Sequence, residues 1–117
     1  MSVELITTDI SNSILDDKVA IFFFAEWHEP SKTSGQMDSV FTLLASQFPA
    51  IKFVKAEAEK IPAFSMKYQI ASVPTFVLLH GNNVFLKLEG ANPAELHKSI
   101  TKLSEMPPPA LGQVEQG

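Results

Sequence analysis

A run of seven consecutive apolar residues, VAIFFFA at positions 19–25, is the strongest pattern in the chain. A run that is rich in β-branched and aromatic residues predicts a strand buried on both faces, in the middle of a sheet. A polar turn around Pro30 follows, and apolar residues then recur at spacings of three and four. This spacing predicts a helix over about residues 31–48, whose start can be capped by Ser31, Thr33 or Ser34.

The remaining chain alternates between strand and helix patterns. Pro62 and Pro93 each suit the first turn of a helix, and Gly81-Asn82-Asn83 predicts a tight turn between the two strands of a hairpin. We therefore expect strands over residues 3–7, 51–56, 75–80 and 84–89, a short helix ending near residue 15, and helices over 62–68 and from 93 onward. This order of elements indicates an α/β fold.

Length and composition describe an ordinary globular domain. A chain of 117 residues, 45% hydrophobic and 19% charged, fits one domain with its own core. The pattern changes from Met106, because three prolines at 107–109 are followed by residues without periodicity. We expect a domain over residues 1–105 and a proline-containing linker or disordered tail over 106–117, which indicates a further domain beyond it.

Charge and hydropathy narrow the classes of partner. A net charge of -4 argues against nucleic acid and against an anionic membrane surface. The chain does not open with a basic segment followed by an apolar core, and no apolar run approaches the ~20 residues that span a bilayer. These features predict a cytoplasmic or nuclear protein with neither a membrane nor a nucleic-acid partner.

The chain contains no cysteine. Disulfide bonds, thiolate zinc sites and thiol catalysis are therefore excluded for this sequence. The three histidines, His28, His80 and His97, show no metal-ligand spacing. The lack of cysteine bears on the interpretation of the segment around the polar turn at Pro30.

Residues 23–32, FFAEWHEPSK, resemble the signature F-W-A-x-W-C-G-P-C-K of thioredoxins. When the shared tryptophan, proline and lysine are aligned, the two redox cysteines of that signature fall on His28 and Ser31. A serine hydroxyl is far too weak an acid for thiol–disulfide exchange, and one histidine makes no metal site. From the residues alone, His28 is a solvated turn residue and Ser31 a helix cap. The resemblance adds two alternatives, a retained docking surface or the replacement of a cysteine at Ser31.

Two further features carry the same resemblance. Val73-Pro74-Thr75 matches a thioredoxin loop in which the peptide bond before the proline is cis. In that family the loop offers backbone groups to an extended peptide or to glutathione. The alternative for this chain is that the loop is required by the fold and binds no ligand. Phe22 falls on the position of a buried aspartate that assists proton transfer, and Lys55 on the lysine that accompanies it. The resemblance thus implies a thioredoxin-like fold, a central mixed β-sheet flanked by helices on both faces, without the groups of a disulfide reductase.

Segments 36–41, 53–59, 68–76 and 88–91 are similar to the N-terminal thioredoxin-like domain of multidomain monothiol glutaredoxins, the PICOT type. Those domains commonly retain only the second cysteine, so this chain departs from them at His28 and at Ser31. The resemblance implies a linker and one or more C-terminal glutaredoxin domains that bind a glutathione-ligated [2Fe-2S] cluster. No cofactor is expected in the present domain.

We therefore expect a redox-inactive docking or targeting domain of a monothiol glutaredoxin that serves iron–sulfur and iron homeostasis. One alternative is a thiol-disulfide oxidoreductase domain whose single active-site cysteine is replaced here by Ser31, and another is a structural spacer domain. No residue of this chain is expected to be catalytic. The expected docking face for a protein partner consists of Trp27, His28, Glu29, Pro30, Ser31, Val73, Pro74 and Thr75.

Overall fold

The computed structural model describes residues 4–6, 18–25, 35–81, 83–90 and 92–107. Five strands form one mixed sheet in the spatial order β1-β3-β2-β4-β5. Strands β1 and β2 run parallel to β3, whereas β4 runs antiparallel to both β2 and β5. The strands are β1 (Glu4–Ile6), β2 (Lys18–Phe24), β3 (Lys52–Glu57), β4 (Thr75–His80) and β5 (Asn83–Glu89), and the helices are α1 (Gln36–Gln47), α2 (Pro62–Lys67) and α3 (Pro93–Glu105).

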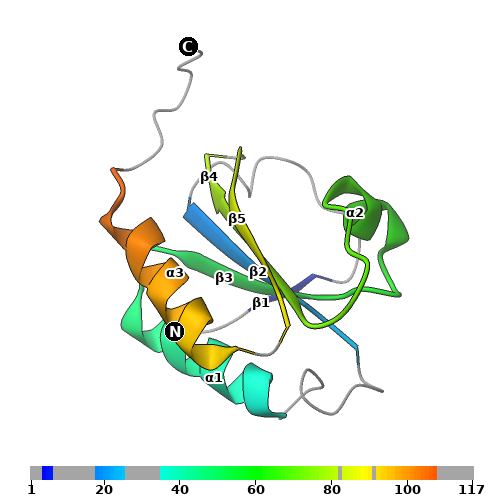
Figure 1. The fold of residues 1–117 in the computed structure, drawn as a ribbon, viewed down its shortest axis with the longest axis horizontal. Coiled ribbons are helices and arrows are strands. Elements are labelled where there is room, and N and C mark those ends of the chain that lie inside the picture. The colour runs from blue at the N-terminus through cyan, green and yellow to red at the C-terminus, as the bar shows by residue number, and fades with distance from the viewer. Residues whose placement is uncertain (1–3, 7–17, 26–34, 82, 91, 108–117) are drawn as a thin grey trace.

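Helices cover both faces of this sheet, with α1 and α3 on one side and α2 on the other (Figure 1). Every residue of β2 is buried, as the apolar run predicts for a strand between two neighbours. Because side chains alternate along a strand, Phe22 and its alternate neighbours pack with α1 and α3. Phe23 joins a second cluster with Ile61 and Tyr68, which flank α2. The predicted mixed sheet with helices on both faces is therefore confirmed.

The helix boundaries show where local sequence decides the structure. Helix α1 begins at Gln36, later than the pattern of apolar residues predicts, and Gly35 at its N-cap makes no side-chain cap. The residues expected to cap it, 31–34, lie outside the described residues, as does the short helix expected near residue 15. At α3, the backbone N–H of Glu95 donates to Oδ1 of Asn92 at 3.1 Å, which caps the helix.

Of the helices that the structure describes, none has the length and apolar character needed to cross a membrane.

The end of α3 is held by two side chains from the sheet. Lys18 is buried, and its ammonium donates to the carbonyl oxygens of Ser104, at 3.1 Å, and Met106. These carbonyls lie at the C-terminus of α3, where a cation is favourable. His80, the register partner of Lys18, places Nε2 2.7 Å from the carbonyl oxygen of Pro107. The expected tail thus starts with two residues that contact the domain; residues 108–117 lie outside the described residues, and the linker stays a prediction.

Candidate functional site

The described part of the expected docking face is the loop between α2 and β4. Residues 27–31 of that face lie outside the described residues. Thr75, the first residue of β4, pairs in register with Phe23 near the end of β2. The loop that contains Val73 and Pro74 therefore lies at the end of the sheet where β2 finishes, which is a common place for binding sites in α/β folds.

The three loop residues have different surroundings. The peptide bond between Val73 and Pro74 is cis. Pro74 and Thr75 are buried, and the hydroxyl of Thr75 donates to the carbonyl oxygen of Ser72 at 2.8 Å, so this side chain supports the loop from inside. Val73 is half-buried, and within the described part of the chain neither its backbone N–H nor its C=O takes part in a hydrogen bond. Val73 is thus the member of the three that can offer both a side chain and backbone groups to a partner.

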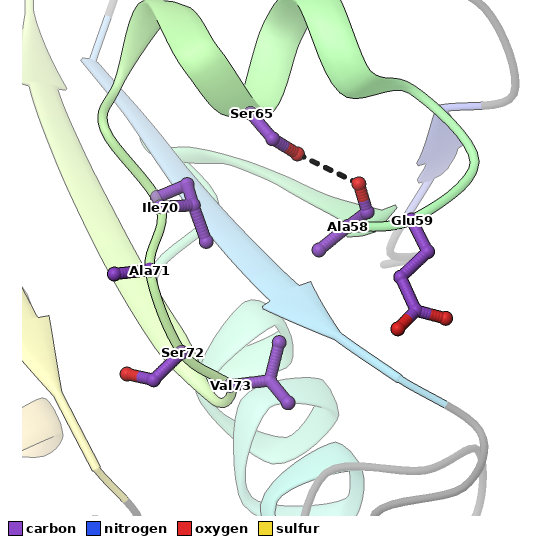
Figure 2. Close-up of a pocket in the computed structure, with 7 residues that line it drawn as sticks. All are labelled: Ala58, Glu59, Ser65, Ile70, Ala71, Ser72 and Val73. Carbon is purple, nitrogen blue, oxygen red and sulfur yellow. Dashed lines mark hydrogen bonds between the residues drawn. The ribbon is translucent and has the colours of Figure 1, made fainter.

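A pocket of about 390 Å³ lies beside Val73. Figure 2 shows its walls, which come from the segment after β3, from α2 and from the loop before β4. On the α2 side, the hydroxyl of Ser65 donates to the carbonyl oxygen of Ala58 at 2.8 Å and ties two walls together. A mostly apolar pocket with few polar groups suits an apolar side chain or a small molecule. Its lining residues are Ala58, Glu59, Ser65, Ile70, Ala71, Ser72 and Val73.

The end of α2 forms the pocket wall through an unusual backbone conformation. Gln69 has φ 56°, in the left-handed region, although it is not a glycine. The N–H of Gln69 donates to the carbonyl of Met66, and the N–H of Ile70 to that of Ser65. This pair of bonds is the Schellman arrangement that closes a helix C-terminus. It turns the chain from α2 directly into the loop that lines the pocket.

On the other face of the sheet, Phe22 occupies the position where the thioredoxin resemblance places an acid. Its ring is fully buried and stacks on Phe76 at 4.7 Å, with Phe41 at 5.2 Å. Phe22 is therefore a core residue, in agreement with the buried strand predicted over residues 19–25. Lys55 instead pairs with Asp38 on α1, with Nζ 2.5 Å from Oδ1. The carboxylate that accompanies this lysine therefore comes from α1 and not from β2.

The described residues offer little acid–base or metal chemistry. No group of three histidine, cysteine, aspartate or glutamate side chains in the described ranges could hold a metal ion. Burial raises the pKa of the Tyr68 hydroxyl above its usual value, so this side chain stays neutral at physiological pH. The sequence contains no cysteine, so it offers no thiol for nucleophilic chemistry.

Sequence reasoning found Val73 but missed most of the pocket. Ile70, at the start of the loop, also lines the pocket. The sequence does not mark Ala58, Ser65 and Ala71 as pocket residues, because small residues are common in turns and short helices of any protein. Their role depends on the fold that brings three segments together.

Comparison with known proteins agrees with the fold. The sequence pattern of the family described as Thioredoxin matches residues 2–102. The chain is 44% identical to monothiol glutaredoxin-S11 of Oryza sativa over 85 residues, which cover 73% of this chain and 17% of that protein. It is 37% identical to glutaredoxin-3 of Homo sapiens over 84 residues, which cover 72% of this chain and 24% of that protein. The chain thus spans about a fifth of the length of these relatives.

A solved structure gives the same answer for the fold. The structure of oxidized mitochondrial thioredoxin 3 from Saccharomyces cerevisiae matches with a TM-score of 0.76 and 31% sequence identity, over 86% of this chain and 94% of that one. The expected thioredoxin-like fold is confirmed, and the chain is homologous to parts of monothiol glutaredoxins. The chain belongs to the thioredoxin family.

Proposed function

We propose that this chain is a redox-inactive thioredoxin-like domain of a multidomain, PICOT-type monothiol glutaredoxin, and that it docks the larger protein onto a partner. The absence of cysteine supports the redox-inactive part, since His28 and Ser31 stand at the two redox positions. Phe22, buried among aromatic rings, leaves no carboxylate at the position of the proton-transfer acid. This also weighs against the alternative of an oxidoreductase that has lost only the cysteine at Ser31.

The pocket beside Val73 is the observation that carries the docking role. Two of its lining residues, Ala71 and Ser72, are exposed, and most of its lining is apolar. The backbone N–H and C=O of Val73 lie next to it and make no hydrogen bond to any residue that the structure describes. We propose an extended segment of a protein partner as the occupant, with one apolar side chain in the pocket and main-chain hydrogen bonds to Val73. In this proposal Trp27, His28, Glu29, Pro30 and Ser31 complete the docking face with Val73, whereas Pro74 and Thr75, which were expected in this face, are buried and support the loop from inside.

The cofactor belongs to another part of the proposed protein. A glutathione-ligated [2Fe-2S] cluster needs a thiolate from the protein, and this chain supplies none. The residues present here do not fit such a cluster. We propose that a following glutaredoxin domain holds it, that the whole protein serves iron–sulfur and iron homeostasis in the cytoplasm or nucleus, and that nucleic acid and membrane are not partners.

We expect this chain to show no disulfide reductase activity. Thiol–disulfide exchange requires a thiolate as nucleophile, and a serine hydroxyl at position 31 cannot supply one at neutral pH. An insulin-reduction assay with a reductant cycle should give the background rate. A rate above that of a heat-denatured sample would contradict the redox-inactive proposal.

The docking role is tested by blocking the pocket. Ala71→Arg places a long cationic side chain at the exposed edge of the pocket, so we expect the affinity for a docked partner to fall roughly tenfold or more. The immobilised chain first captures proteins from cell extract, and calorimetry then measures the binding of each captured protein to the purified variants. Ala94→Arg, at an exposed position of α3 on the opposite face of the sheet, is the matched control and should bind as the wild type does. Equal binding by Ala71→Arg would show that docking occurs elsewhere.

A further inference from the structure

We propose that Lys87 on β5 is a positioning residue for the pocket, which it keeps open by holding the start of the loop over residues 69–73. This inference rests on the proposed docking function, because it concerns the same pocket. Lys87 does not line the pocket and is 18 residues from Gln69 in sequence. Its role follows from what its ammonium contacts.

The Lys87 ammonium reaches across from β5 to the C-terminus of α2. Its Nζ lies 3.3 Å from the carbonyl oxygen of Tyr68 and 3.1 Å from that of Gln69. The last carbonyls of a helix have no partner inside the helix, and a cation that binds them also interacts favourably with the helix dipole. The two bonds are charge-assisted, which makes them stronger than ordinary amide hydrogen bonds. Lys87 therefore adds, from a neighbouring strand, two side-chain hydrogen bonds to the Schellman bonds that already close α2.

The loop needs such support for two reasons. Helix α2 has only six residues, fewer than an isolated helix requires for stability. Gln69 also adopts a left-handed conformation that is unfavourable for a residue with a side chain. Both weaknesses lie at the position where the chain leaves α2 and enters the pocket wall. Binding two consecutive carbonyls there by one ammonium fixes this conformation directly.

The same strand holds the other end of the loop. The N–H of Gly90, which follows β5, donates to the carbonyl oxygen of Pro74 at 2.9 Å. Between these two attachments, Ala71 and Ser72 are exposed and Val73 is half-buried. The geometry thus has β5 holding both ends of the loop, with Lys87 at the entrance and Gly90 at the exit. Only the first attachment depends on a side chain, so Lys87 is the position where one substitution changes the loop.

A nearby carboxylate does not replace this role. Glu89 places Oε2 3.9 Å from the Lys87 Nζ, and the Glu89 side chain is 56% exposed. A solvent-exposed ion pair at this distance contributes little. The carbonyl oxygens of Tyr68 and Gln69 are closer, and they belong to the chain that forms the pocket wall. Removing the ammonium is therefore expected to act on the pocket more than on β5.

The test uses a probe of the pocket that does not require the natural partner. Nitrogen-15-labelled protein is titrated with 2-methyl-1-propanol, which has the size of a branched apolar side chain, and amide shifts are followed. In the wild type we expect saturable shifts at Ala58, Ile70 and Val73, which line the pocket. Lys87→Met keeps the chain length but cannot donate, so both bonds to the loop are lost, and the apparent affinity should fall roughly tenfold or more.

Three comparisons separate positioning from simple stability. Lys87→Arg keeps a cation with several donors and should restore most of the probe affinity. Lys98→Met removes an exposed lysine of α3 and should leave both affinity and thermal midpoint unchanged. If Lys87→Met does not fold, Lys87→Gln, which keeps a neutral donor, replaces it with a smaller expected loss of affinity.

The outcomes distinguish this inference from the function on which it rests. Unchanged probe affinity in Lys87→Met, with or without a lower thermal midpoint, would make Lys87 a structural residue and overturn the inference alone. Absence of saturable shifts in the wild type would instead overturn the proposed pocket docking, and the inference with it. A selective loss in Lys87→Met, with rescue by Lys87→Arg, supports both.

Discussion

Replacing Phe22 by alanine is expected to lower the free energy of unfolding by about 3–5 kcal/mol, the range for an aromatic side chain removed from a well-packed core. The ring has no exposed surface, and it contacts Phe76 and Phe41 from β4 and α1. Its removal leaves a cavity between the sheet and a helix that the rigid strand β2 cannot close. A loss of this size is a large fraction of the stability of an ordinary domain.

Phe22→Asp should be more damaging still. It restores the residue type that the thioredoxin resemblance places there, but among aromatic rings and without a free cation beside it. Lys55, which accompanies that acid in the family, is here bound to Asp38. A buried carboxylate without a partner costs several kcal/mol beyond the lost packing. We expect this variant to be largely unfolded at room temperature.

Urea denaturation followed by circular dichroism measures both effects. Leu43→Ala, which truncates a leucine on α1 that is 58% exposed, is the control and should change stability by less than ~0.5 kcal/mol. A loss below ~1.5 kcal/mol for Phe22→Ala would mean that the aromatic cluster can repack around the gap. A stable Phe22→Asp variant would mean that water or a neighbouring group can satisfy a carboxylate at this position.

The central part of this fold could be predicted because burial on both faces leaves a clear signature. An unbroken apolar run such as residues 19–25 fits only a strand that packs against helices on either side, and β2 is such a strand. The hairpin of β4 and β5 was equally clear, since Gly81 and its two following asparagines mark a tight turn.

The candidate site could be predicted only at the Val73–Pro74 loop. The pocket walls are tied by side chains that donate to main-chain carbonyls, as Ser65 does to Ala58 and Lys87 to Gln69. A carbonyl oxygen is present at every residue, so such bonds leave no pattern of residue types in the sequence. The start of α1 was misjudged for a related reason. Apolar spacing reports the buried face of a helix but not its first turn, and Gly35 sets the boundary at Gln36.

The sequence analysis identified Lys55 as a lysine that accompanies an acid, but it did not identify Asp38 as the acid that pairs with it. The resemblance identified it as the companion of a buried acid, and the structure supplies that acid from α1, as Asp38 in the first turn of the helix. The ammonium also lies 4.9 Å from the centre of the Phe24 ring. The side chains of Lys55 and Asp38 are only 12% and 15% exposed, so the pair is largely shielded from water.

Asp38→Leu is therefore expected to destabilise the domain by about 3 kcal/mol, because it leaves the ammonium of Lys55 partly buried with its carboxylate gone. The double variant Asp38→Leu with Lys55→Met should recover most of that loss, since two apolar side chains of similar size carry no desolvation cost. Urea unfolding of the wild type, both single variants and the double variant gives the coupling free energy directly. A coupling near zero would mean that each charge is satisfied by water. The pair would then be an ordinary surface contact, and the move of the acid from β2 to α1 would have no energetic consequence.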